Sequence, residues 1–153
     1  MIEIKKESIK DIKEEMLPLL VLHKEEVAPY DFLELNPAWD LYDAGEDAGS
    51  FVVYTVRDDG VLVGYLAYLI NQSLHYQDER FAYADVIFLQ DAYRHSYTAN
   101  DLLTYAEADL TDNYGVTMML LHMKVKAPFE TLALCQDYDK MEYVYTKYVG
   151  GIE

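Results

Sequence analysis

The chain has 153 residues, enough for one domain spanning residues 1–153 and too few for two ordinary domains. Apolar residues make up 52% of it, which excludes the depleted composition of a disordered chain. Because 28 acidic residues outnumber 12 basic ones, the net charge of -16 argues against nonspecific binding to nucleic acid or to anionic lipid. The surplus carboxylates favour a basic partner or serve solubility alone, and the sequence leaves both explanations open.

The N-terminal residues contain no apolar signal core, and no apolar run approaches the length that spans a membrane. A cytoplasmic location is therefore the default expectation. Cys135 is the only cysteine, so the chain can form no intramolecular disulfide. We expect Cys135 to pack in the core as part of a helix.

The first half of the N-terminal region alternates apolar and charged residues, which predicts a strand at residues 2–5. Ser8 can then cap a helix whose apolar residues, from Ile9 to Leu22, recur at helical spacing. Pro18 favours a break or a kink near the middle of this helix. Residues 30–42 form an irregular or helical stretch, and residues 43–49 are a polar linker.

The central region is rich in β-branched and aromatic residues. Two such runs, at 51–56 and 61–70, flank a turn that contains Asp59-Gly60, so they predict a β-hairpin. A polar connection at 71–80 leads into another strand at 81–89. Leucine and alanine residues then repeat on one helical face over 98–113, and Gly115 ends that helix.

The C-terminal region predicts three more elements. Residues 116–125 form a strand that is apolar enough for a central place in the sheet. A helix runs from Pro128 towards Tyr138, and the alternating residues 142–149 make a final strand. The order of elements predicts an α/β (α+β) fold, a mixed central sheet flanked by helices.

The segment from Asp85 to Ala99 is the most informative one. An apolar strand runs directly into a turn that begins with Arg94 and opens a helix. Unpaired N–H groups and the positive end of the helix dipole meet at such a junction, so an anion such as pyrophosphate is a natural ligand there.

This segment resembles the acyl-CoA-binding motif of the GCN5-related N-acetyltransferases (GNAT), which is written Arg/Gln-x-x-Gly-x-Gly/Ala. Arg94, Ala99 and the preceding Tyr93 match the pattern, whereas Tyr97 replaces the first glycine. The hairpin with Gly60 and Gly64, and the run Tyr138-Asp139-Lys140 near the C-terminus, also resemble elements of this family. The altered motif is similar to that of small acetyltransferase-like proteins of bacteriophages.

The resemblance implies a GNAT-like acyl-CoA N-acyltransferase fold that uses acetyl-CoA as co-substrate. It implies that the main chain of Ile87, Phe88 and Leu89 contacts pantetheine and the thioester. It also implies that the turn holds the pyrophosphate through the following residues: Arg94, His95, Ser96, Tyr97, Thr98, Ala99 and Asn100. Because a residue with a Cβ resists positive φ, either the turn takes ordinary dihedrals with Tyr97 pointing away, or CoA binds weakly or not at all.

Two residues inherit catalytic roles from the resemblance. Asp85 lies where several family members carry a glutamate base, and apolar neighbours there would raise its pKa. A carboxylate at a sheet edge, or one that orients substrate, is an equal alternative. Tyr138 matches the tyrosine that protonates the departing thiolate in many relatives, the alternative being a tyrosine with a buried ring and a solvated hydroxyl.

No metal-ligand spacing links the four histidines, and the chain has no nucleophile elbow and no glycine-rich nucleotide motif. The resulting hypothesis is direct acetyl transfer to an amine. The acidic surface and the segment from Trp39 to Tyr42 favour a cationic acceptor, such as a lysine or an N-terminal amine of a protein. The alternatives are an acidic binding protein that occupies a basic or nucleic-acid-binding partner, or a structural protein. No direct binding to nucleic acid or membrane is expected, and the oligomeric state, a homodimer included, stays open.

Overall fold

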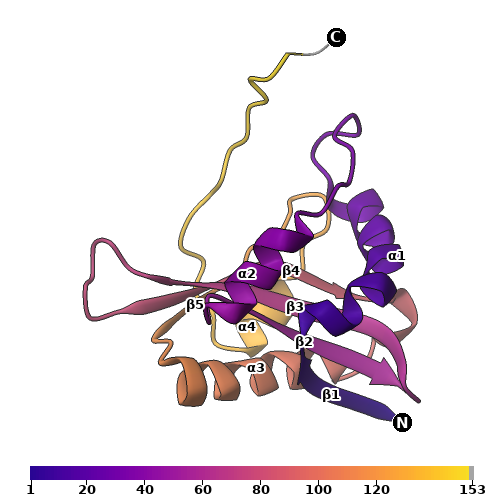
Figure 1. The fold of residues 1–153 in the computed structure, drawn as a ribbon, viewed down its shortest axis with the longest axis horizontal. Coiled ribbons are helices and arrows are strands. Elements are labelled where there is room, and N and C mark those ends of the chain that lie inside the picture. Colours follow the sequence, from indigo (N-terminus) through magenta and orange to yellow (C-terminus); the bar gives the residue numbers. More distant parts are fainter. Residues whose placement is uncertain (152–153) are drawn as a thin grey trace.

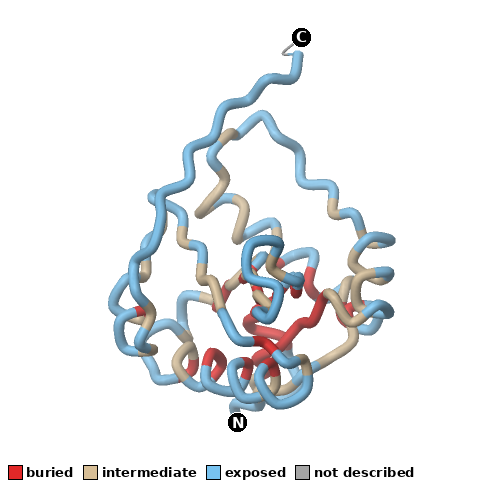
Figure 2. The backbone as a smooth tube through the Cα atoms, turned by 90° about the vertical axis from the view of Figure 1, so that its left-hand side faces the viewer, coloured by how far each residue is buried: buried red, intermediate tan, exposed pale blue. Residues whose placement is uncertain are grey.

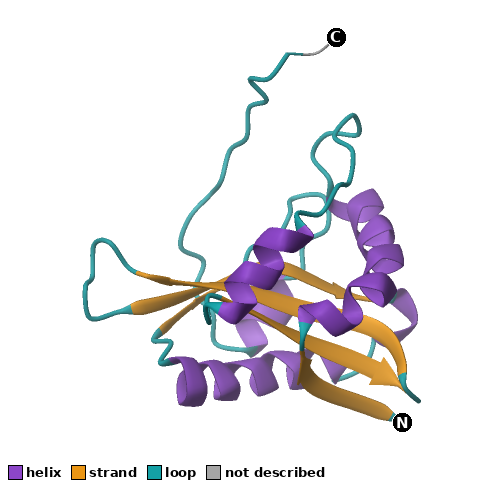
Figure 3. Ribbon diagram, in the orientation of Figure 1, coloured by secondary structure: helices purple, strands orange, loops and turns teal. Residues whose placement is uncertain are grey.

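The computed structural model describes residues 1–151 and places a mixed five-stranded sheet between two groups of helices (Figures 1 and 3). Its elements follow in chain order: β1 (Ile2–Glu7), α1 (Ile9–Val27), α2 (Trp39–Asp47), β2 (Phe51–Asp58), β3 (Val61–Gln72), β4 (Arg80–Leu89), a 3-10 turn η1 (Asp91–Tyr93), α3 (Thr98–Tyr114), β5 (Met118–Leu120) and α4 (Glu130–Cys135). The strand order is β1-β2-β3-β4-β5. Strands β1, β2, β3 and β4 each pair antiparallel with the next strand, and β5 runs parallel to β4. The predicted mixed sheet flanked by helices is confirmed.

The hairpin of β2 and β3 forms as predicted. Asp59 and Gly60 both have positive φ, 46° and 85°, as the tight turn between twisted antiparallel strands requires. Gly64 has a different role, because a Cβ there would lie 2.8 Å from the carbonyl oxygen of Phe88. The absence of a side chain at this position lets β3 approach the end of β4 closely.

The sheet has a hydrophobic core on each face, and the buried residues concentrate there (Figure 2). Ile9, Ile12 and Met16 of α1 pack against one face of β2 and β3. Leu102, Leu103 and other residues of α3 pack against the opposite face. Successive residues of β2 and β3 alternate between these two cores, and this explains why both strands are buried almost continuously.

Two predictions for the N-terminal region are wrong. Helix α1 continues through Pro18 without a break, and α2 includes Asp43–Asp47, which the polar composition had placed in a linker. The polar side chains of α2 have a structural use. Glu46 accepts hydrogen bonds from the Ser8 hydroxyl and from the Ile9 N–H, at 2.8 Å for the latter. The start of α1 is thus capped by α2 and not by Ser8. Among residues 1–151, no helix is both long enough and apolar enough to cross a membrane.

The C-terminal region departs most from expectation. The predicted strand 116–125 shrinks to Met118–Leu120 and lies at the edge of the described sheet instead of its centre. Helix α4 stops at Cys135, and that cysteine is exposed, not buried. Residues 142–149 form no strand. A strand needs a neighbour for its backbone groups, and none of the described residues supplies one here.

Candidate functional site

Strands β4 and β5 separate partway along β4. Strand β4 pairs with β3 over its whole length, but with β5 only from Phe81 to Tyr83. The Gln90 N–H donates to the Val63 carbonyl, so by alternation Ile87 and Leu89 turn their backbone groups to the side without a neighbour. The outer edge of β4 beyond Tyr83 therefore has no neighbouring strand, although the His122 ring lies at the Ala84 carbonyl and Arg94 donates to the Leu89 carbonyl.

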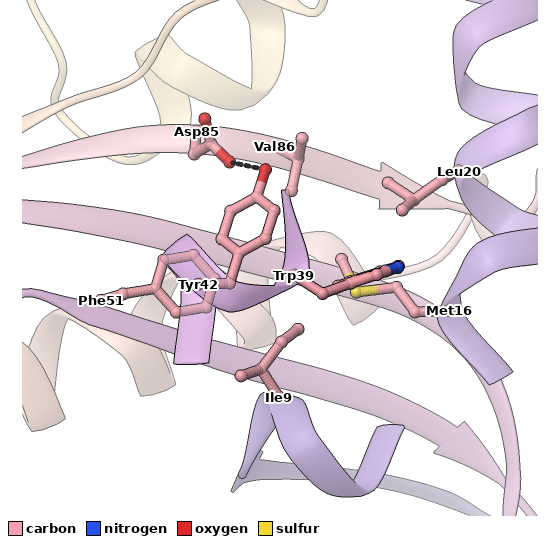
Figure 4. A pocket seen from close by; sticks show the side chains of 8 residues that line it. All are labelled: Ile9, Met16, Leu20, Trp39, Tyr42, Phe51, Asp85 and Val86. Carbon is pink, nitrogen blue, oxygen red and sulfur yellow. Dashed lines mark hydrogen bonds between the residues drawn. The ribbon is translucent and has the colours of Figure 1, made fainter. Parts of the chain in front are cut away.

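A β-bulge lies at the point of separation. Ala67 faces Val86 and Tyr68 faces Ala84, so Asp85 is an extra residue without a partner on β3. The bulge turns the Asp85 carboxylate towards α2, where the Tyr42 hydroxyl donates a hydrogen bond to Oδ2 at 3.2 Å (Figure 4). Sequence reasoning missed the role of Tyr42. The two residues lie 43 positions apart, and no local spacing connects them.

The surroundings of Asp85 make its carboxylate a stronger proton acceptor than that of an ordinary aspartate. Burial raises the pKa of Asp85, and the Tyr42 hydrogen bond and the Lys124 ammonium offset part of this rise. Burial and the adjacent carboxylate likewise raise the pKa of Tyr42 to about 12, so its hydroxyl stays protonated and donates. The pair thus consists of a carboxylate base and a fixed neutral donor.

Aromatic and aliphatic side chains line a small pocket beside this pair, and Asp85 itself is exposed at the surface. The pocket is lined by Ile9, Met16, Leu20, Trp39, Tyr42, Phe51, Asp85 and Val86 (Figure 4). The Tyr42 ring lies 4.9 Å from Phe51 and 5.9 Å from Trp39, measured between centroids. Only about 10 Å³ stays free between the side chains, which is room for one water or one small head group.

The turn after β4 offers unpaired donors. Helix α3 begins at Thr98, whose N–H is bonded to the Ser96 hydroxyl at 3.3 Å. Five other backbone N–H groups have no acceptor among the described residues: His95, Ser96, Tyr97, Ala99 and Asn100. Together with the dipole of a 17-residue helix, these N–H groups suit the oxygens of a phosphate.

The backbone of Tyr97 takes an ordinary conformation, with φ -77° and ψ 0°. Its side chain points into solvent and is 82% exposed. Of the two expectations for this position, the turn with ordinary dihedrals is therefore the one observed. Tyr97 in place of glycine therefore does not strain the turn, and its ring extends away from the protein surface.

Arg94 makes internal contacts. Its guanidinium donates to both carboxylate oxygens of Glu26, at 2.8 and 2.9 Å, and Nε donates to the Leu89 carbonyl at 2.6 Å. It also lies over the Phe88 ring, 5.3 Å from the centroid. Because Glu26 compensates the positive charge of Arg94, an anion at this turn would be bound mainly by the neutral backbone N–H groups.

Tyr138 lies on the other face of the sheet. It follows α4, and its N–H donates to the Ala133 carbonyl at 3.0 Å. Burial raises the pKa of its phenol, which lies beside the fully buried phenol of Tyr68. Tyr68 pairs with Ala84, next to the bulge. Asp85 and Tyr138 thus flank β4 from opposite faces.

Comparison with known proteins identifies the family of this chain. The model of the Acetyltransferase (GNAT) family matches residues 9–130, a range that includes the bulge, the open edge of β4 and the turn. None of the curated proteins matches the sequence significantly.

Several solved structures share the fold. A GCN5-related N-acetyltransferase from Ralstonia eutropha JMP134 matches with a TM-score of 0.76 and 14% identity, over 98% of this chain and 100% of its own. A ribosomal-protein-alanine N-acetyltransferase from Brucella melitensis biovar Abortus 2308 matches with a TM-score of 0.70 and 18% identity, over 99% and 100%. A predicted acetyltransferase with acetyl-CoA from Clostridium acetobutylicum matches with a TM-score of 0.72 and 12% identity, over 96% of each chain.

Proposed function

Because this chain belongs to the GNAT family of acetyltransferases, we propose that it transfers an acetyl group from acetyl-CoA directly to a primary amine. Acetyltransferases of the GNAT fold use acetyl-CoA as co-substrate, and one structural neighbour is described with it. The observation that carries the proposal is the set of free N–H groups from His95 to Asn100 beside the open edge of β4. It supplies the two features that an extended, phosphorylated thioester needs.

In this proposal the pantetheine amides pair with the backbone of Ile87 and with the N–H of Leu89, in the place that a neighbouring strand would take. The Leu89 carbonyl already accepts from Arg94. The Phe88 side chain is buried in the core that α1 covers. The pyrophosphate lies on the turn from Arg94 to Asn100, where N–H groups and the start of α3 meet it. His95 is exposed and is free to add a donor.

The chemistry then follows from the two faces of β4. Asp85 accepts a proton from the ammonium group of the acceptor, directly or through a water, and the neutral amine that results attacks and forms a bond to the thioester carbon. Backbone N–H groups of β4 stabilise the oxyanion. As the carbon–sulfur bond breaks, the Tyr138 hydroxyl gives its proton to the thiolate, and its pKa, raised by burial, keeps it protonated until then. The nitrogen of the new amide loses its second proton in the same step, and this proton returns the Tyr138 phenolate to its neutral form.

We propose a cationic acceptor with a slender stem, such as a lysine or an N-terminal amine of a basic protein. The pocket beside Asp85 admits only a small head group, and Trp39 and Tyr42 present aromatic faces to it. Helix α2, which supplies Trp39 and Tyr42, also carries the acidic residues Asp40, Asp43, Glu46 and Asp47. One structural neighbour is named for acetylating alanine of a ribosomal protein, which is an acceptor of this kind.

Calorimetric titration with acetyl-CoA tests the proposal. Saturable binding supports it, whereas no heat of binding at millimolar ligand would refute the enzyme hypothesis and favour the acidic binding protein.

With binding established, Tyr138→Phe should slow acetyl transfer about 10²-fold or more while CoA affinity stays unchanged, because the variant keeps the ring and loses only the proton. Tyr143→Phe is the matched control, since that residue is 75% exposed and lies outside every helix and strand. Equal rates for the two variants would exclude Tyr138 as the acid.

A further inference from the structure

The hydroxyl of Tyr68 is buried and has no hydrogen-bond partner among residues 1–151. The side chain is fully inaccessible to solvent, in the hydrophobic core that α3 covers, and on β3 it stands opposite Ala84, next to the bulge of β4. A buried hydroxyl without a partner loses its hydrogen bonds to water and gains none in return, so it destabilises the fold. A phenylalanine would fill the same space without this loss, and the hydroxyl therefore calls for an explanation other than packing.

The neighbour of this hydroxyl is the phenol of Tyr138, the acid of the proposed reaction. Tyr68 reaches it from β3, and Tyr138 from the segment after α4. The Tyr68 O–H can donate and the Tyr138 oxygen can accept, but in the resting structure the Tyr68 hydroxyl makes no hydrogen bond of normal geometry. It is therefore an unused donor beside the proposed acid.

The surroundings otherwise oppose a negative charge on the Tyr138 oxygen. Burial raises the pKa of Tyr138, the Tyr68 hydroxyl opposes this rise, and the Glu107 carboxylate of α3 adds to it. A third phenol, that of Tyr54 on β2, meets the Tyr68 ring edge to face and donates its hydroxyl to Asp109 at 2.8 Å. Among residues 1–151, Tyr68 is thus the only group that lowers the pKa of Tyr138.

We propose that Tyr68 is a positioning residue for this reaction, whose hydroxyl donates a hydrogen bond to the Tyr138 oxygen as that oxygen becomes a phenolate. The inference rests on the proposed function, because it requires Tyr138 as the acid. No proton leaves Tyr68. The Tyr138 O–H bond breaks as its proton moves to the thiolate sulfur, the Tyr68 O–H donates to the phenolate oxygen, and the proton lost by the new amide nitrogen restores Tyr138. A hydrogen bond that is absent at rest and forms with the charge favours the transfer itself.

Carbon-detected NMR of protein labelled at tyrosine Cζ tests the donor without substrate, and Tyr138→Phe assigns the resonance. Tyr68→Phe keeps the ring and removes the hydroxyl. At a pH where about 10% of wild-type Tyr138 is ionised, its phenolate fraction should therefore fall about threefold or more in Tyr68→Phe. Tyr65→Phe is the matched control and should leave that fraction unchanged, because Tyr65 is equally buried on β3 but lies in the core on the other face. Tyr68→Phe should unfold at the wild-type temperature or above it. An unchanged phenolate fraction, or a lower unfolding temperature that reveals a structural partner, overturns the proposal.

Single-turnover acetyl transfer to poly-lysine, followed by the loss of thioester absorbance, tests the catalytic part. Tyr68→Phe should slow the transfer about tenfold with unchanged affinity for acetyl-CoA, and should cause no further loss in a Tyr138→Phe background, because the two hydroxyls act as a unit. A slow Tyr138→Phe beside a Tyr68→Phe at the wild-type rate, or additive losses in the double variant, overturns the proposal and leaves Tyr138 as the acid. A Tyr138→Phe at the wild-type rate refutes the acid itself, and this proposal with it.

Discussion

Replacing Tyr42 with Phe removes the hydroxyl that donates to Asp85 and keeps the ring that packs on Phe51. A hydrogen bond to a charged group contributes about 1.5–3 kcal/mol. At 3.2 Å the bond is long and Asp85 is exposed, so we take about 1 kcal/mol for the charged form. Since one pKa unit corresponds to about 1.4 kcal/mol, the pKa of Asp85 should rise by about 0.7 unit in Tyr42→Phe.

Carbon-detected NMR of the aspartate carboxyl groups measures this shift without any substrate, and Asp85→Asn assigns the resonance. The sign is fixed by the chemistry, because losing a donor destabilises the carboxylate and leaves the protonated acid unaffected. Tyr105→Phe is the control, since Tyr105 lies on α3 on the other face of the sheet. A pKa of Asp85 that stays the same or falls in Tyr42→Phe would refute the reasoning.

Two further predictions concern charge. Glu26→Gln should tighten CoA binding about threefold in calorimetry, because it frees the Arg94 guanidinium from a partly exposed ion pair. Glu25→Gln is the control, since it makes the same charge change without that contact. Equal effects of the two variants would contradict the prediction. Arg57→Met should lower the free energy of unfolding in urea by about 2 kcal/mol at pH 7, because it leaves the half-buried Glu7 carboxylate unpaired. Burial raises the pKa of Glu7, but the hydrogen bonds from Arg57 outweigh burial and hold this pKa below its ordinary value of 4.5. The pair therefore stabilises the fold fully at a pH above 4.5, and the stabilisation is lost as the pH falls through the lowered pKa of Glu7. The difference between the two proteins should therefore narrow in acid, and a constant difference would contradict this explanation.

Local signals in the sequence were sufficient for the middle of the fold. Asp59-Gly60 defines the hairpin turn, and Gly115, with φ 65°, ends α3 where the pattern predicted. These residues act through their own backbone preferences, which a sequence displays directly.

The errors lie where structure depends on distant partners. Glu46 of α2 caps the start of α1, and nothing near it in sequence shows this contact. Strand β5 is short because β4 pairs with it only from Phe81 to Tyr83. The pairing of Tyr42 with Asp85 exists only once the bulge turns the carboxylate towards α2. Each case needs a contact between segments, which periodicity and composition do not encode.

The turn from His95 to Asn100 presents its ligand groups on the main chain, and this frees its side chains to vary. Any residue that accepts the dihedrals of Tyr97 and leaves the N–H groups uncovered preserves the same set of donors. Motifs defined by side-chain identity therefore underestimate how many sequences can form such a turn. Homologues with altered motifs are better compared by the backbone hydrogen bonds that stay unpaired than by the presence of glycine.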